Sequence, residues 1–327
     1  MIPPRRRLLS WYRRHARPLP WRRDRDPYRV WLAEAMLQQT TVAAVLPRYE
    51  RFLRRFPDLN SLARAPESAV LKEWAGLGYY ARARNLAAAA RMIAARPGGD
   101  WPRDIDSWLA LPGIGRYTAA AVLSITWDLP HAVLDANVAR VLCRWHGIRR
   151  DPRRPAAQKL LWNLAQSSLD PRHPGDWNQA MMELGETVCT SQKPICPACP
   201  LRASCSACKN NMQDRLPLLA PKRAAQDLRW TCLWIERDGQ VLLWKRGPEE
   251  LLLKNHWGLP EAGRVRARPG AVIKTVRHAI TRYRILLTIR NAQSLGPQPP
   301  QAKWVARPRL KRLLVSSLWL KALPGPR

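Results

Sequence analysis

The segment LPGIGRYTAAAV, residues 111–122, constrains the fold more than any other part of the sequence. Its proline and its two glycines, Gly113 and Gly115, do not suit a helix interior, because proline lacks a backbone N–H and glycine is too flexible. The small residues that follow Tyr117 favour a helix over residues 118–124. The segment therefore predicts a tight turn that leads directly into the start of a helix.

The charge of the chain indicates what such a turn could hold. The 56 Lys and Arg residues outnumber the 24 Asp and Glu residues, so the formal net charge is +32. This excess favours a polyanionic partner, either a nucleic acid or an acidic membrane. Most of the cations are arginine and alanine is abundant, a composition that a GC-rich genome also produces, so charge alone leaves the partner open. No apolar run reaches the roughly 18 residues of a membrane span.

A glycine turn before a helix exposes backbone N–H groups at the positive end of the helix dipole. It can therefore contact DNA phosphates without reading the base sequence, although many such turns simply connect two helices. A second turn of this kind, GLGYYA at residues 76–81, also precedes a predicted helix. Two such turns on one basic domain could contact a nucleic-acid backbone twice.

Hydrophobic periodicity divides the chain into two parts. Apolar residues recur at helical spacing within residues 27–190. The basic N-terminal segment lacks the apolar centre of a signal peptide, and we expect it to form an amphipathic helix. Further on, two short apolar runs around Asp238 and Gly239 predict a β-hairpin, and residues 282–292 predict another strand. We expect a mostly α N-terminal domain over residues 1–208, a linker over 209–226 and a small α/β domain over 227–327.

Four cysteines form a cluster with the spacing C-x6-C-x2-C-x5-C, namely Cys189, Cys196, Cys199 and Cys205. We expect a cytoplasmic protein, in which clustered cysteines indicate metal binding rather than disulfides. The spacing matches neither a zinc ribbon nor the bacterial ferredoxin pattern. Cys208 adds a second C-x2-C pair, so zinc bound by the last four of these five cysteines remains an alternative.

The turn and its surroundings resemble the helix-hairpin-helix of the endonuclease III superfamily of DNA repair glycosylases. A short helical run precedes the turn, and Asp135 follows Tyr117 by 18 residues, as the family pattern requires. WLAEAMLQQT, GLGYYARARNL, LPGIGRYTAAAVLS and NQAMMELGETVC further resemble the adenine DNA glycosylases of the MutY type. Bifunctional members of the superfamily carry a lysine where this chain has Tyr117, and a phenol cannot form an imine. The resemblance therefore implies a monofunctional enzyme.

Cleavage of an N-glycosidic bond needs an acid for the leaving base and an anion beside the cationic sugar. Glu34 lies in an apolar helical stretch, which would raise its pKa, although a lone glutamate there could simply mark the polar face of a helix. The resemblance implies that Glu34 protonates adenine, that Asp135 stabilises the sugar cation, that Asn137 supports this region and that Tyr117 lies against the acid. It also implies an adenine pocket formed by Trp21, Arg22 and Gln179, a wedge formed by Gln38, Gln39 and Tyr79, and a DNA-backbone contact at Gly113 and Gly115.

The same resemblance extends to the cysteines and to the second domain. The spacing resembles the loop that holds a [4Fe-4S] cluster in these glycosylases, so it implies Cys189, Cys196, Cys199 and Cys205 as ligands with a structural role. GLPEAG at residues 258–263 resembles a Nudix-like domain that recognises oxidised guanine. The acidic residues of an active Nudix hydrolase do not follow it. His278 and Thr281 match the lesion-recognition loop, in which Arg282 replaces a histidine.

These observations together predict a mostly α helix-hairpin-helix glycosylase domain with an iron–sulfur loop and a small α/β Nudix-like C-terminal domain. We expect a monomer that removes adenine opposite 8-oxoguanine or guanine in double-stranded DNA during base excision repair, without a membrane partner. The alternatives are a thymine glycosylase for T·G mispairs, a lyase of the endonuclease III kind and a non-catalytic iron–sulfur DNA-binding protein. The second domain argues against the thymine glycosylase, and the missing lysine argues against the lyase. The two acids argue against a non-catalytic binding protein, because pure binding has no use for two anions near a phosphate backbone.

Overall fold

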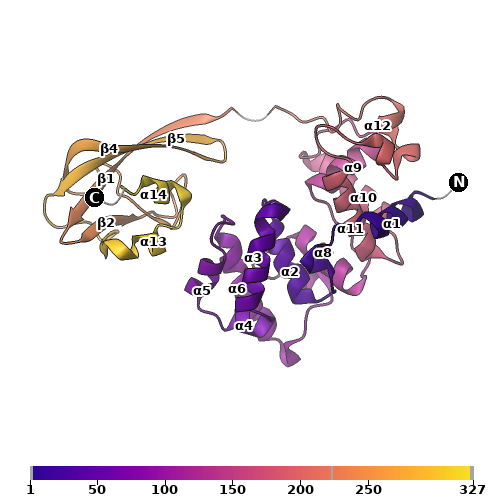
Figure 1. The fold of residues 1–327 in the computed structure, drawn as a ribbon, viewed down its shortest axis with the longest axis horizontal. Helices are drawn as coiled ribbons and strands as arrows, with labels where there is room; N and C mark the ends of the chain where they lie inside the picture. The colour runs from indigo at the N-terminus through magenta and orange to yellow at the C-terminus, as the bar shows by residue number, and fades with distance from the viewer. Residues whose placement is uncertain (1–2, 222–223, 325–327) are drawn as a thin grey trace. The chain divides into compact units, whose positions relative to one another are not determined.

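The computed structural model describes residues 3–221 and 224–324, and the chain divides into two compact units, residues 1–220 and 221–327 (Figure 1). The first unit is helical and the second contains a mixed β-sheet. A mostly α domain followed by an α/β domain is therefore confirmed. The first unit ends later than residue 208, because Leu216 is buried and its carbonyl accepts a hydrogen bond from the Arg144 guanidinium at 2.8 Å. The beginning of the expected linker thus packs on the helical unit.

The helical unit follows the predicted periodicity, and its basic N-terminal segment forms an amphipathic helix that buries Leu8, Leu9, Trp11 and Tyr12. Its elements are α1 (Pro4–His15), η1 (Pro20–Arg22), α2 (Pro27–Leu37), α3 (Val42–Arg55), α4 (Leu59–Ala63), α5 (Glu67–Glu73), α6 (Ala81–Ala94), η2 (Pro97–Gly99), α7 (Ile105–Leu109), α8 (Arg116–Trp127), α9 (Ala136–His146), α10 (Pro155–Ser168), α11 (Pro174–Thr187), η3 (Cys196–Ala198), η4 (Arg202–Ser204) and α12 (Ser206–Lys209). Among the described residues, no helix has the length and apolarity that crossing a lipid bilayer requires.

Helix α8 is the centre of this unit, since residues 118–125 are all buried. Its run of alanines presents little side-chain volume, and both α2 and α11 pack against it. The backbone of α11 comes especially close at Gly175, where a Cβ atom would lie 2.5 Å from the carbonyl oxygen of Ser124. The small residues of α8 therefore bring side chains of α2, α8 and α11 to one place.

The sequence correctly predicts the turn between α7 and α8. Gly113 has φ +74°, which favours glycine, and a Cβ atom there would lie 2.6 Å from the Asn85 amide nitrogen of α6. Gly115 is the N-cap residue of α8 and provides no side-chain cap for its first N–H groups. The N-terminus of α8 is thus held against α6 with backbone donors that lack a side-chain cap. The second turn, over residues 76–78, precedes α6 as expected.

The second unit contains a sheet with the strand order β3-β2-β1-β5-β4, and β6 pairs with β2. The turn at Asp238 and Gly239 joins β1 to β2 as predicted, and residues 282–292 lie largely in β5, which runs parallel to β1 and antiparallel to β4. Trp319 is fully buried in the core of this unit. Its elements are β1 (Gln226–Arg237), β2 (Gln240–Lys245), β3 (Trp257–Gly258), β4 (Ala267–Ile280), β5 (Tyr283–Ser294), β6 (Ala302–Ala306), η5 (Arg307–Arg309), α13 (Leu310–Leu313) and α14 (Ser317–Ala322).

The close approach of α11 to α8 predicts the effect of one added methyl group. In Gly175→Ala the new Cβ would overlap the α8 backbone, so the helices must separate, at a cost of about 1–3 kcal/mol. We expect a lower midpoint of thermal unfolding, measured by circular dichroism at the helical band. Gly247→Ala is the matched control, because a Cβ there meets nothing within 4 Å. Equal midpoints for both variants would contradict this account of the packing.

Candidate active site

A cavity of about 840 Å³ opens in the helical unit, between α2, α8, α9 and α11. Its size suits a small organic ligand or a nucleotide. The cavity brings together predicted site residues that lie far apart in the sequence. Those that line it are Trp21, Arg22, Glu34, Gln38, Gln39, Gly113, Gly115, Tyr117, Asp135, Asn137 and Gln179.

Glu34 projects from α2 into apolar surroundings, and only 6% of its surface is exposed. The Tyr117 hydroxyl donates a hydrogen bond to Glu34 Oε2 at 2.8 Å, and its oxygen lies 3.1 Å from Met182 Sδ. Burial raises the pKa of Glu34 to about 7; the charge of Asp135 adds to this effect, whereas the Tyr117 hydrogen bond and the charge of Arg22 oppose it. Glu34 can therefore carry a proton near neutral pH.

Tyr117 lies on the first turn of α8, two residues after the Gly115 cap. Burial raises the pKa of this phenol well above its usual range, and the charges of Glu34 and Asp135 act in the same direction. The hydroxyl consequently stays protonated, and it stabilises Glu34 most when Glu34 is ionised. Tyr117 is thus a hydrogen-bond donor to the buried acid, and it offers no amine for covalent chemistry.

Asp135 is the second acid of the cavity and the N-cap residue of α9. Its carboxylate accepts a hydrogen bond from the Val138 backbone N–H at 2.7 Å. Burial raises the pKa of Asp135, but backbone N–H groups of Val138 and Asn137 and the charge of Arg140 oppose this. The N-terminal end of α9 also favours the negative form. The pKa of both acids is raised overall, but Asp135 has backbone donors arranged for its charge, whereas Glu34 lies in apolar surroundings.

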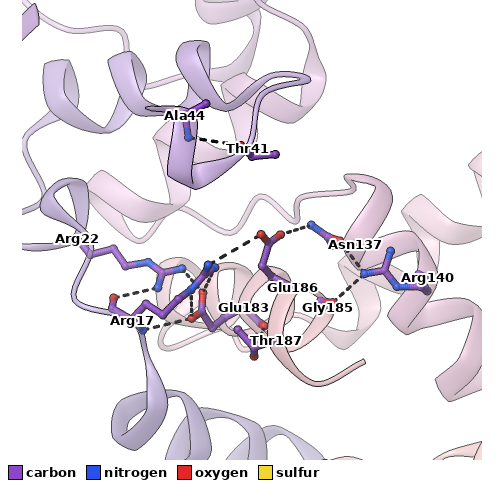
Figure 2. Close-up of polar contacts among 10 residues, drawn as sticks. All are labelled: Arg17, Arg22, Thr41, Ala44, Asn137, Arg140, Glu183, Gly185, Glu186 and Thr187. Atoms are coloured by element: carbon purple, nitrogen blue, oxygen red, sulfur yellow. Dashed lines mark hydrogen bonds and ion pairs between the residues drawn. The ribbon is translucent and has the colours of Figure 1, made fainter. Parts of the chain in front are cut away.

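A buried ion cluster that the sequence analysis missed forms one wall of the cavity (Figure 2). Glu183 of α11 is 1% exposed and binds Arg17 Nε at 2.7 Å and Arg22 Nη2 at 2.8 Å. Burial raises the pKa of Glu183, but the hydrogen bonds from both arginines outweigh it, so the pKa is lowered overall. Glu183 and Glu186 are three residues apart near the C-terminal end of α11, and this spacing could have indicated a paired acidic face.

Asn137 connects this wall to α9. Its amide nitrogen donates to Glu186 at 3.2 Å, and its oxygen accepts from Arg140 Nη2 at 2.7 Å (Figure 2). Arg140 also donates to the carbonyls of Gly185 and Cys189, each at 2.8 Å. The polar contacts thus continue from the cavity to the first cysteine of the predicted metal loop.

Two exposed loops carry the predicted wedge residues, and Arg82 joins them. Its guanidinium donates to the carbonyl of Gln38 on one loop and of Leu77 on the other. Gln39 and Tyr79 both have positive φ, at 57° and 46°, which is unusual for these residue types and is found most often at functional sites. Tyr79 does not line the cavity; it is 56% exposed and stacks over Arg82 at 5.5 Å.

The predicted metal-binding cysteines lie around one small cavity, which Cys208 and Arg144 also line. Arg144 Nη1 lies 3.4 Å from Cys189 Sγ, so this thiol has a positively charged donor beside it. Closely grouped thiols with N–H donors suit an iron–sulfur cluster, whose soft metal prefers thiolate ligands. Among the described residues, no three His, Cys, Asp or Glu side chains form a group that could hold a single metal ion. The cysteine residues nevertheless have the chemistry and the common cavity that a cluster requires.

The two remaining predicted residues lie in the second unit, on the β4–β5 hairpin. Thr281 is at the turn with φ +52°, and its hydroxyl donates to the carbonyl of Ile280 at 2.7 Å. The oxygen of this exposed hydroxyl can still accept a hydrogen bond. His278 is half-buried, and its Nε2 lies 3.4 Å from Ser317 Oγ. Burial lowers the pKa of His278, as does the charge of Lys321, so the imidazole is mainly neutral at pH 7.

Comparisons with known proteins agree with this geometry. A family model described as "HhH-GPD superfamily base excision DNA repair protein" matches residues 32–167. The adenine DNA glycosylase of Buchnera aphidicola subsp. Acyrthosiphon pisum is 36% identical over 247 residues, which cover 73% of this chain and 71% of that protein. The adenine DNA glycosylase of Rattus norvegicus is 47% identical over 224 residues, or 66% of this chain. The match covers only 43% of the rat protein, so this chain spans less than half of that relative.

Solved structures share the fold of the helical unit. A thermostable thymine-DNA glycosylase aligns with a TM-score of 0.56 at 29% sequence identity, covering 63% of this chain and 95% of that one. An endonuclease III in a non-covalent DNA complex aligns with a TM-score of 0.53 at 24% identity, covering 65% of this chain and all of that one. The latter likeness concerns the fold alone.

The raised pKa of Glu34 predicts a pH dependence of stability. Between the unfolded value of 4.5 and the folded value of about 7, the folded state holds a proton that the unfolded state has lost. Stability therefore decreases as pH rises through this window, by about 3 kcal/mol for this one group. Glu34→Gln removes the titration and keeps the shape. We expect urea unfolding between pH 5 and 8 to show the variant gaining stability relative to the wild type as pH rises. Parallel profiles for the two proteins would contradict the raised pKa.

Proposed function

The chain belongs to the adenine DNA glycosylase family, and we propose that it hydrolyses the N-glycosidic bond of adenine mispaired with 8-oxoguanine or guanine in duplex DNA. The observation that carries this proposal is the pair of unlike acids in one cavity. Glu34 is buried with a pKa near 7, and Asp135 accepts backbone hydrogen bonds at the start of α9. Such a pair matches the needs of glycoside cleavage, in which one group donates a proton and the other stays negative.

Glu34 is the general acid of the proposed reaction. Its proton passes to a ring nitrogen of adenine as the bond between the base and the sugar breaks, and the bonding electrons leave with the base. The carboxylate that results remains buried and accepts the hydrogen bond of the Tyr117 hydroxyl. This hydrogen bond strengthens as negative charge develops on Glu34, so it favours proton release at the moment when the base departs.

Asp135 stabilises the positive charge that develops on the sugar. Its carboxylate is fixed by the Val138 N–H and lines the same cavity as Glu34. Water then completes the hydrolysis. The described residues that line the cavity include no lysine, and Tyr117 occupies the position where lyases of this superfamily carry one. This chain therefore supports hydrolysis of the base, without an imine to the sugar.

The surroundings of the cavity suit an extrahelical adenine. Trp21 and Gln179 contribute an apolar and an amide surface, while Glu183 holds Arg22 at the wall. An adenine removed from the base stack needs such a pocket, and its removal costs a few kcal/mol. The fixed Arg22 guanidinium is a donor for the acceptor nitrogens of the base.

Several features outside the cavity support duplex binding. Backbone N–H groups at Gly113 and Gly115 can contact phosphate at the start of α8. Gln39 and Tyr79, on the two loops joined by Arg82, are exposed and suit insertion into the base stack. On the β4–β5 hairpin, the Thr281 hydroxyl and the neutral His278 are the proposed contacts to the oxidised guanine.

The cysteine loop completes the proposal. Cys189, Cys196, Cys199 and Cys205 would hold a [4Fe-4S] cluster, with Arg144 beside the first of them. When bound, the cluster cross-links four points of the loop and contributes no step of bond cleavage. Lys193 and Arg202 lie exposed on this loop, where they can contact phosphate.

A second candidate function follows from the thymine-DNA glycosylase whose structure aligns with the helical unit at 29% identity. The two activities differ in the base that is released, so a comparison of substrates distinguishes them.

We expect single-turnover base release from duplexes to proceed fastest for adenine opposite 8-oxoguanine and more slowly for adenine opposite guanine. Thymine opposite guanine and thymine glycol opposite adenine should remain intact. Asp135→Asn should lose at least about 100-fold in rate and keep its affinity for DNA, because the sugar cation loses its anion while the binding surface is unchanged. Borohydride should trap no covalent complex.

The possible contrary results have distinct meanings. Thymine release would assign the chain to the second candidate, and adenine release without preference for 8-oxoguanine would contradict the role of Thr281. Wild-type activity in Asp135→Asn would contradict the mechanism. Tight DNA binding without release of any base would indicate a non-catalytic binding protein.

A further inference from the structure

Five thiols surround a site for a cofactor that needs four ligands. Cys208 lines the same small cavity as the four cysteines with the family spacing. It is not part of that spacing, and the proposed function assigns it no role. The cavity therefore contains one thiol more than the cofactor requires.

Three of the five thiols have donors fixed by the fold. The Cys189 thiol lies beside the Arg144 guanidinium, at 3.4 Å. The Cys199 thiol accepts a backbone N–H from Leu201. Burial raises the pKa of the Cys199 thiol to about 12, and the Leu201 N–H opposes this rise. A donor of this kind favours the thiolate that binds a metal.

The Cys205 thiol has the same kind of environment. It lies at the N-terminal cap of α12, and the thiol donates to the Arg144 carbonyl at 3.4 Å. Burial raises the pKa of Cys205, and backbone N–H groups of Cys208 and Ala207 oppose this. The helix then places Cys208 one turn later, three residues from Cys205, so both side chains lie on the same face. The short helix thus directs Cys208 toward the cavity while its backbone supports Cys205.

Cys196 is in a different position, because its hydrogen-bond partner is the thiol of Cys208. The two thiols line the same cavity and interact with each other, so both can serve the same corner of a cluster. We infer that Cys196 and Cys208 are alternative ligands for one iron of the proposed [4Fe-4S] cluster, so that Cys208 takes over when Cys196 is lost. This inference rests on the proposed cofactor.

The exchange is a simple ligand substitution. The Cys208 thiol loses its proton and its sulfur binds the iron, while the Cys196 sulfur leaves the iron and takes up a proton. No electron is transferred and no oxidant is required. The consequence is a cluster that survives damage to Cys196, whereas the corner held by Cys189 has no second thiol in hydrogen-bond contact in the part of the chain that the structure describes.

Serine variants of the full-length chain test this inference. Iron and acid-labile sulfide per chain, together with visible absorbance, should show a full cluster in the wild type and in Cys208→Ser. Cys196→Ser should keep most of its iron. Cys189→Ser, the matched control, should lose the cluster, and so should the double variant Cys196→Ser/Cys208→Ser. Far-UV circular dichroism confirms that each variant is folded.

Alkylation of the native proteins provides a second readout that does not depend on iron content. Iodoacetamide followed by mass spectrometry should label Cys208 in the wild type, where it is a free thiol, and should leave it protected in Cys196→Ser. Labelling of Cys208 in an iron-loaded Cys196→Ser protein would overturn the inference, because the introduced serine or a water molecule would then occupy the corner.

The remaining outcomes separate the inference from the cofactor proposal. A wild type that contains zinc or no iron contradicts the cluster itself. An iron-loaded wild type whose Cys196→Ser variant loses as much iron as Cys189→Ser overturns the ligand exchange alone. Loss of iron from Cys208→Ser would make Cys208 an obligatory ligand and would also overturn it.

Discussion

The hydrogen bond from Tyr117 to the buried carboxyl of Glu34 is the interaction on which the candidate site depends. Burial alone would disfavour proton release from Glu34, because the resulting carboxylate would lack solvation. The phenol supplies one fixed donor in place of water, and it keeps the pKa near neutrality instead of higher. The same residue excludes the alternative chemistry, since a phenol cannot form an imine. One side chain therefore lowers the pKa of the buried acid and offers no amine for covalent chemistry.

The packing of the helical unit holds this pair in place. Alanines of α8 allow α2 and α11 to approach, and the close contact at Gly175 fixes the position of α11. That helix in turn carries Met182 against Tyr117 and Glu183 against two arginines. The ion pairs between a buried carboxylate and two arginines are costly to break, and few side-chain arrangements satisfy them. These ion pairs therefore fix the wall of the cavity that also contains the two acids.

Local chemistry explains which features the sequence predicts. The turn before α8 and the hairpin at Asp238 depend on glycine and proline, so they can be read without tertiary information. The raised pKa of Glu34 also follows from its apolar neighbours in the sequence. The Glu183 cluster could not be predicted in this way, because its arginines lie about 160 residues earlier and only folding brings them together. The end of the helical unit lies beyond the predicted residue 208 for the same reason, since the Arg144 guanidinium donates to the carbonyl of Leu216, 72 residues later.

The most direct test of this account is the pH dependence of adenine release by the wild type and by Tyr117→Phe. The substitution keeps the ring and removes the hydroxyl that lowers the pKa of Glu34. Single-turnover rates of the wild type should fall as pH rises above about 7, when Glu34 loses its proton. In the variant this decline should begin at higher pH, because the buried carboxylate has lost its donor. An unchanged decline, or one that moves to lower pH, would contradict the role of the Tyr117–Glu34 hydrogen bond.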